Sequence, residues 1–165
     1  MNIVLIGYRG CGKTTVGRHL ADALWMRFVD IDEQIARQSR RSVAEVLQLV
    51  GEEEFSRIET YIIASVSAGD NQVIGISGRA LKLAANVESL KSSGKGKLIW
   101  LSAEPEVLAK RLAARGGPVN STDTLAEVQA PLAQRAPVYE SAADVTIDTT
   151  YLTVEQTVQQ IVKRI

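Results

Sequence analysis

Near its start the chain carries the sequence Ile3-Val4-Leu5-Ile6-Gly7-Tyr8-Arg9-Gly10-Cys11-Gly12-Lys13-Thr14. An apolar run typical of a buried strand ends at Ile6, and a segment with helical spacing begins at Thr14. The residues between them fit the pattern G-x-x-x-x-G-K-[ST] at every fixed position. Because the pattern stands between a strand and a helix, it predicts a loop that binds the phosphates of a nucleotide.

Each residue type in this loop suits the binding of a polyphosphate. Glycines, here including Gly10 and Gly12, let backbone N–H groups come close to the phosphates without obstruction by a Cβ atom. The following helix presents its positive end, Lys13 adds a charge near the β and γ phosphates, and the Thr14 hydroxyl can ligate Mg²⁺. The loop therefore predicts binding of ATP or ADP with Mg²⁺, at a site that also includes Cys11 and Thr15.

Short β-rich runs alternate with longer segments of helical spacing along the whole chain. This alternation predicts one α/β domain over residues 1–165, a P-loop fold with a five-stranded parallel sheet and helices on both faces. The expected strands are 3–6, 27–29, 72–76, 97–101 and 144–147, and the expected helices are 14–25, 43–50, 54–68, 105–114 and 154–165.

Composition narrows the class of protein. The chain has 165 residues, 45% of them hydrophobic, with 19 basic and 19 acidic side chains and one cysteine. A balanced charge argues against a nucleic-acid partner, and a lone cysteine argues against a disulfide framework. No apolar run approaches the roughly 20 residues of a membrane-spanning helix, and no signal-peptide pattern occurs. We therefore expect a cytoplasmic protein, monomeric and without a membrane partner.

One segment interrupts the alternation. Residues 115–123 concentrate Gly, Pro and small polar side chains directly after an expected helix. In a phosphate-binding fold such a segment suits a lid that covers the bound nucleotide. The alternative is that it is only an exposed connector.

A pair of carboxylates follows the second expected strand. Asp30 and Asp32 are separated by Ile31, and alternate residues at the end of a strand point to the same side. We expect both to converge near the γ-phosphate, where a carboxylate can orient an acceptor hydroxyl or take its proton. The alternative is that Asp32 caps a helix that begins at Glu33.

The order and spacing of several motifs resemble the shikimate kinase family, a branch of the nucleoside-monophosphate-kinase-like P-loop fold. The motifs are the loop with its continuation Thr15-Val16-Gly17-Arg18, then Phe28-Val29-Asp30-Ile31-Asp32, Gly51-Glu52-Glu53-Glu54-Phe55, and Arg135-Ala136-Pro137-Val138-Tyr139. The likeness spans nearly the whole chain. It implies transfer of the γ-phosphoryl group of MgATP to a hydroxyl of shikimate, a small anionic acceptor.

The resemblance also implies roles for individual residues. Lys13 and Asp32 would be catalytic, with Asp32 holding the acceptor hydroxyl, and Asp30 would act on the magnesium side through water. Arg135 would bind the carboxylate of the acceptor, for which a planar guanidinium is well suited. Arg111 would lie beside the adenine.

The chain departs from the family pattern around the acceptor. Ser56 stands where the family has a substrate-binding arginine, with Arg57 one residue later. The family's three-glycine segment is Ser77-Gly78-Arg79 here, so only Gly78 is kept. Arg79 would either narrow the acceptor pocket or supply a new cation in it. In the lid, Gly117 replaces an arginine, which leaves Arg115 as the nearest basic side chain.

In an active shikimate kinase, Arg79 and also Arg57 or Arg115 would replace the missing arginines. The departures leave two alternatives to this hypothesis. Residues 77–82 loosely resemble gluconate kinases, so the acceptor could be another polyol that carries a carboxylate. The protein could also be a nucleotide-binding relative with little kinase activity.

Overall fold

The computed structural model of the chain describes residues 1–91, 96–114 and 125–165. They contain one five-stranded parallel sheet in the order β2-β3-β1-β4-β5. The predicted α/β fold with a parallel sheet is therefore confirmed, and each strand overlaps a predicted run. The strands are β1 Asn2–Ile6, β2 Arg27–Asp30, β3 Gln72–Gly75, β4 Gly96–Ser102 and β5 Val145–Asp148.

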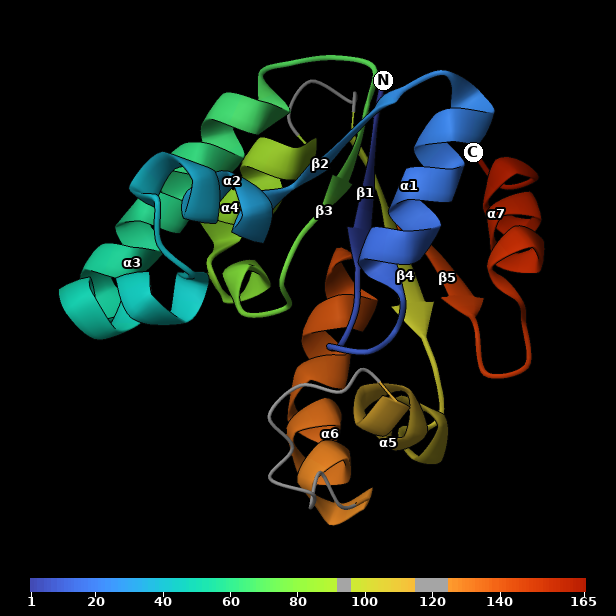
Figure 1. The fold of residues 1–165 in the computed structure, drawn as a ribbon. Coiled ribbons are helices and arrows are strands. Elements are labelled where there is room, and N and C mark those ends of the chain that lie inside the picture. The colour runs from blue at the N-terminus through green and yellow to red at the C-terminus, as the bar shows by residue number, and fades with distance from the viewer. Residues whose placement is uncertain (92–95, 115–124) are drawn as a thin grey trace.

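The strand order determines where a ligand can bind. From β1 the chain goes first to one side of the sheet, to β2 and β3, and later to the other side, to β4 and β5 (Figure 1). At such a reversal the loops leave the carboxyl ends of neighbouring strands in opposite directions, and a crevice opens between them. The loop after β1 lies at this reversal.

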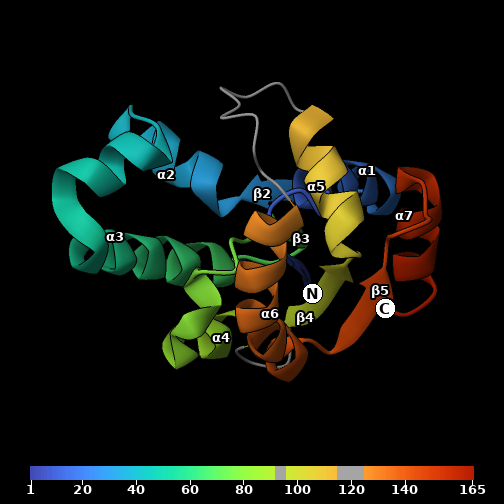
Figure 2. The ribbon, with the colours of Figure 1, turned by 90° about the horizontal axis from the view of Figure 1, so that it is seen from below.

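Helices cover both faces of the sheet, as predicted (Figure 2). Alternate residues of β1 face opposite sides, so Ile3 and Leu5 pack in one hydrophobic cluster with α1, α5 and α7, while Val4 and Ile6 pack in the other with α2, α3 and α4. The helices are α1 Lys13–Leu24, α2 Ile31–Ser39, α3 Val43–Ser67, α4 Ala84–Lys91, α5 Pro105–Ala114, α6 Leu125–Ala142 and α7 Val154–Val162, with a short 3₁₀ helix η1 at Ala80–Lys82.

Helices α4 and α6 were not expected from the sequence, and α2 was expected only in the alternative in which a helix begins at Glu33. In α6 two prolines, Pro131 and Pro137, lie inside the helix and mask its helical pattern. Helix α4 is short, and α2 begins directly where β2 ends, without a loop between them. By contrast, the expected break between helices 43–50 and 54–68 is present within α3, because Gly51 has a non-helical φ of 80° and ψ of 171°.

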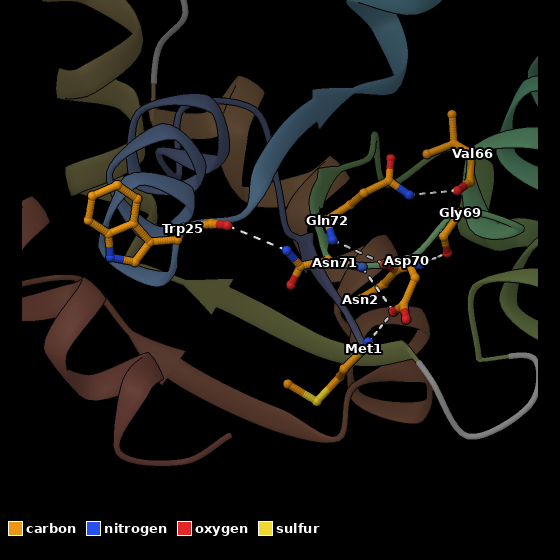
Figure 3. A network of polar contacts seen from close by, with 8 residues as sticks. All are labelled: Met1, Asn2, Trp25, Val66, Gly69, Asp70, Asn71 and Gln72. Atoms are coloured by element: carbon orange, nitrogen blue, oxygen red, sulfur yellow. Dashed lines mark hydrogen bonds and ion pairs between the residues drawn. The ribbon is translucent and has the colours of Figure 1, made fainter.

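At the end of the sheet away from the loop after β1, the side-chain amides of Asn2 and Gln72 form a network of hydrogen bonds (Figure 3). Asn2 donates to the carbonyl of Gly69 at 2.9 Å and accepts from the backbone N–H of Gln72 at 3.1 Å. The amide of Gln72 in turn donates to the carbonyl of Val66 at 3.0 Å. Both amide side chains are buried, so these bonds fix the start of β1 against β3 and the end of α3.

Within residues 1–91, 96–114 and 125–165, no helix has both the length and the apolar character needed to cross a bilayer.

Candidate active site

The loop from residue 7 to residue 12 joins β1 to α1, where the sequence predicts the phosphate site. Gly10 and Gly12 have φ values of 83° and 99°, in the left-handed region that strains residues with a Cβ atom. Gly12 is the N-cap of α1, so the unpaired N–H groups of the first helical turn open toward the loop. This arrangement provides backbone donors and the positive end of a helix for an anion.

Lys13 reaches back across the loop. Its Nζ atom donates to the carbonyl oxygens of Gly7 at 2.7 Å and Tyr8 at 3.1 Å. The ammonium group is therefore held against the loop, and Lys13 lines the cleft that the loop borders. Cys11 differs from its neighbours, because its thiol is 2% exposed and packs in the hydrophobic core.

Thr14 and Asp30 form the candidate magnesium site. The Thr14 hydroxyl donates to Oδ2 of Asp30 at 3.1 Å, while Oδ1 of Asp30 accepts from the backbone N–H groups of Asp32 and Glu33 at 3.0 and 3.4 Å. Asp30, and not Asp32, thus caps α2, and the alternative capping role for Asp32 was wrong. Two hard oxygen donors side by side fit Mg²⁺, which takes its other ligands from phosphate oxygens and water. Within the described residues no cluster of three or more His, Cys, Asp or Glu side chains offers a further metal site.

Asp32 lies beside Asp30, but not for the reason predicted. Strand β2 ends at Asp30, and Asp32 belongs to the first turn of α2. Helical geometry rather than strand alternation therefore brings the two carboxylates to the same cleft, which both of them line. Ile31 is fully buried, as predicted.

The environment of Asp32 makes it a stronger base than an ordinary aspartate. Burial raises its pKa, and the neighbouring carboxylate of Asp30 raises it further, while Arg79 and Lys13 act in the opposite direction. Its Oδ1 atom is buried and has no hydrogen-bond partner among the described residues. Asp32 lines the cleft, and a carboxylate there is suited to accept a hydrogen bond from an acceptor hydroxyl.

The far wall of the cleft is the turn after β3. Gly78 lies against the buried ring of Tyr139, and a Cβ atom on it would be 2.0 Å from the tyrosine hydroxyl. Only glycine fits there, which explains why this one position of the family's three-glycine segment is kept. Burial raises the pKa of Tyr139 to about 12, so its hydroxyl stays protonated at neutral pH.

Arg79 supplies a cation to the cleft. Its guanidinium lies over the ring of Phe55, 4.4 Å from the centroid, and Nη2 donates to Oε1 of Glu59 at 3.3 Å. The side chain is 40% exposed and lines the cleft. The guanidinium of Arg79 therefore borders the cleft, and its role toward the acceptor stays a prediction.

Arg135 faces the same space from α6. Its guanidinium lies 5.3 Å from the ring centroid of Tyr8, at the phosphate loop. The cleft thus joins the loop, the two aspartates and three arginines, Arg9, Arg79 and Arg135, in a volume of about 350 Å³. Its lining is Gly7, Arg9, Gly10, Gly12, Lys13, Thr14, Asp30, Asp32, Val43, Gly75, Ile76, Ser77, Gly78, Arg79 and Arg135.

A second cavity adjoins the loop on the side of α5 and α7. Arg111 is fixed there, since its two terminal nitrogens donate to the hydroxyl and the carbonyl of Thr149 at 3.1 and 2.7 Å. Gly10, Cys11, Gly12 and Thr15 line the same cavity, which has a volume of about 380 Å³. This groups Arg111 with the loop, where the sequence places the nucleotide.

Two other sequence predictions concern Arg57 and the lid. Arg57 is 68% exposed and pairs with Glu53 and Glu54 at the surface, and it does not line the cleft. The hypothesis that Arg57 replaces a missing substrate arginine was therefore wrong. The predicted lid, with Arg115 and Gly117, lies outside the described residues.

Sequence reasoning did not identify Glu59. This carboxylate on α3 is 2% exposed and accepts from both Ser77 and Arg79 at 3.3 Å. Burial raises its pKa, and the guanidinium of Arg79 lowers it by a smaller amount. The signal in the sequence was a glutamate at helical spacing between Phe55 and Ile62, on a face that is otherwise apolar.

Comparisons with known proteins agree with this geometry. A model of the shikimate kinase family matches residues 9–165. A shikimate kinase of Symbiobacterium thermophilum is 40% identical over 100% of this chain and 96% of its own length. The structure of a shikimate kinase from Acinetobacter baumannii in complex with shikimate is 30% identical, with a TM-score of 0.86 over 98% of this chain and 90% of that one.

A more distant likeness concerns the fold alone. A gluconokinase from Sinorhizobium meliloti 1021 has a TM-score of 0.65 at 22% identity, over 96% of this chain and 87% of that one. The full-length agreement with the shikimate kinases is at higher identity and includes the family match. The chain therefore belongs to the shikimate kinase family.

Proposed function

We propose that this protein transfers the γ-phosphoryl group of MgATP to a hydroxyl of shikimate. The observation that carries the proposal is a single cleft bordered by a phosphate-binding loop, the half-buried carboxylate of Asp32, and the guanidinium groups of Arg9, Arg79 and Arg135. These are the parts that phosphoryl transfer to an anionic alcohol requires: a cradle for the phosphates, an acid–base group for the hydroxyl, and cations for the charge of the acceptor.

On the donor side, backbone N–H groups of Gly10, Cys11, Gly12 and Lys13 bind the phosphates, and Lys13 also neutralises charge on the transferring group. The Thr14 hydroxyl and, through water, Asp30 would hold the metal ion. When bound, Mg²⁺ would supply neutralisation of the phosphate charge. Arg111 and Thr15 border the part of the site that takes the nucleoside.

On the acceptor side, Asp32 accepts the proton of the attacking hydroxyl. Its buried position supports this role, because a raised pKa makes the carboxylate a better proton acceptor. Arg135 and Arg79 bind the carboxylate of shikimate, and Gly78 leaves room for its ring. Attack by the oxygen on the γ-phosphorus breaks the bond to the β-phosphate oxygen and releases ADP.

Two competing functions remain testable against this one. A carboxylate-bearing polyol such as gluconate would use the same two arginines. A nucleotide-binding protein with little turnover would keep the loop without a competent acceptor side, but the unpaired oxygen of Asp32 argues for a hydroxyl partner.

An assay of ADP release with MgATP and a panel of acceptors separates these functions. Shikimate should give saturable turnover, while gluconate and quinate should give less than about one tenth of its kcat/KM, since ring shape and hydroxyl position select the transition state. Preference for gluconate would reassign the acceptor. ATP binding without turnover on any acceptor would support the nucleotide-binding alternative.

We also propose that the chain is one domain that works as a monomer in the cytoplasm. Every group assigned above comes from one copy of the chain, and the phosphoryl donor, ATP, is supplied by the cytoplasm. Residues 115–123 are proposed to cover the bound nucleotide.

A further inference from the structure

A buried ion pair connects the acceptor half of the cleft to helix α3. Glu59 is 2% exposed, whereas its partner Arg79 keeps 40% of its side chain accessible. A carboxylate withdrawn from water to this extent needs charged or hydrogen-bonding partners, and Glu59 has two, Ser77 and Arg79. Both partners belong to the turn after β3, so Glu59 fixes that turn against α3.

The pair restricts where the guanidinium of Arg79 can lie. Glu59 binds its Nη2 atom, and the ring of Phe55 supports its flat face at 4.4 Å. A guanidinium stacked on a buried ring and anchored at one corner loses most of its rotational freedom before any ligand arrives. Pre-organisation of this kind lowers the entropic cost of binding.

Arg79 still has unused hydrogen-bonding capacity. A guanidinium carries five N–H donors, and the bond to Glu59 uses one of them. Its Nε atom is buried and has no partner among the described residues. The side chain lines the cleft together with Arg135, which enters from α6. Arg79 and Arg135 therefore reach the same space from different elements, next to Asp32 and opposite the cations of the phosphate loop, Arg9 and Lys13.

We propose that Glu59 is a positioning residue that holds Arg79 in the cleft, and that Arg79 recognises the carboxylate of the acceptor. The inference rests on the proposed function and deepens it, since it names a residue that fixes one of the two arginines assigned to the acceptor carboxylate. Asp32 and the backbone N–H groups of the phosphate loop do not supply selectivity for a carboxylate, because they act on a hydroxyl and on the phosphates.

The test compares shikimate with its methyl ester, which keeps the ring and hydroxyls but has no negative charge. Binding of each to the ADP-loaded protein is measured by calorimetry, with the wild type, Arg79→Gln, Glu59→Gln and the double variant. Arg79→Gln should weaken shikimate binding about 10- to 100-fold, as expected for loss of one partner of a charged pair. Its preference for the acid over the ester should be at least about threefold smaller than the preference of the wild type, which should exceed about tenfold. The preference that remains in the variant is due to Arg135.

Glu59→Gln should weaken shikimate binding about 3- to 10-fold in the wild-type background and less than about twofold in the Arg79→Gln background, because it acts through Arg79. The matched control is Arg57→Gln, an exposed arginine on the same helix, which should leave both affinities unchanged. Undiminished acid preference in Arg79→Gln would overturn the inference. So would an equal effect of Glu59→Gln in both backgrounds.

A second variant and a separate turnover assay distinguish failure of this inference from failure of the proposed function. If Arg79→Gln does not fold, Arg79→Lys is used in its place. Loss of the planar guanidinium should still weaken shikimate binding about fivefold. Wild-type affinity in this variant would overturn the inference. Turnover of the wild type on shikimate is measured independently. No turnover would contradict the proposed function, while the binding data would still decide the role of Arg79.

Discussion

Asp30 and Asp32 are separated in the chain by Ile31 alone, yet their surroundings give them different tasks. Asp30 has both oxygens occupied, one by the Thr14 hydroxyl and one by the N-terminus of α2. Asp32 has a buried oxygen without a partner among the described residues and a raised pKa. The first is suited to fix a metal ion and the second to accept a proton.

Replacement of Asp32 by asparagine tests this division. The amide keeps the shape of the side chain but cannot take a proton, so kcat for shikimate should fall by about 10²- to 10⁴-fold. The KM for ATP should change less than about twofold, since the phosphates are bound by the loop. Steady-state kinetics with each substrate varied in turn measures both values, and a kcat near that of the wild type would remove Asp32 from catalysis.

The buried carboxylate of Glu59 predicts a pH-dependent contribution to stability. Its pKa is raised in the folded protein, chiefly by burial, so the folded state holds the proton more tightly than the unfolded state does. Stability from this group is fully present below the unfolded pKa of about 4.5 and is lost as the pH rises through the folded pKa. Relative to Glu59→Gln, the wild type should therefore lose free energy of unfolding as the pH rises through that window.

Urea denaturation of both proteins across this pH range measures the difference. A wild type that instead gained stability over Glu59→Gln with rising pH would show that the ion pair with Arg79 outweighs burial.

At the scale of elements, most of the fold was predictable because most elements have one strong periodic signal. All five strands lie where apolar runs indicated them, and the loop after β1 has the predicted context. Helix α6 was missed because Pro131 and Pro137 lie within it. Because α6 carries both Arg135 and Tyr139, the positions of these two residues in the site could not be predicted without it.

Gly51 divides α3 into two arms, and the second arm carries Phe55 and Glu59. The glycine has a φ of 80° and ψ of 171°, and a Cβ atom added to it would meet nothing within 4 Å. Gly51→Ala should therefore destabilise the protein by about 1–2 kcal/mol through backbone strain alone. A matched change, Ser67→Ala at the end of the same helix, should alter stability by less than about 0.5 kcal/mol.

Urea midpoints of the two variants give the comparison. Equal midpoints for Gly51→Ala and the wild type would mean that the break in α3 does not depend on glycine.

At the scale of the whole molecule, the sequence indicated the donor side of the site better than the acceptor side. Most of the donor side lies on a continuous segment, residues 7–15, whose spacing predicts a phosphate-binding loop, and only Asp30 and Arg111 come from elsewhere in the chain. The acceptor side is assembled from α2, α3, the turn after β3 and α6. The pairing of Arg79 with Glu59 joins residues 20 positions apart, and no local pattern predicts such a contact.

The most direct test of the central claim is phosphorus NMR of the protein with MgATP and shikimate. The γ-phosphate signal should decline in step with the growth of one new phosphate-monoester signal, absent without shikimate and nearly absent with Lys13→Ala, which removes a cation that the transfer needs. Loss of the γ-phosphate to inorganic phosphate only, with no monoester formed, would contradict the account.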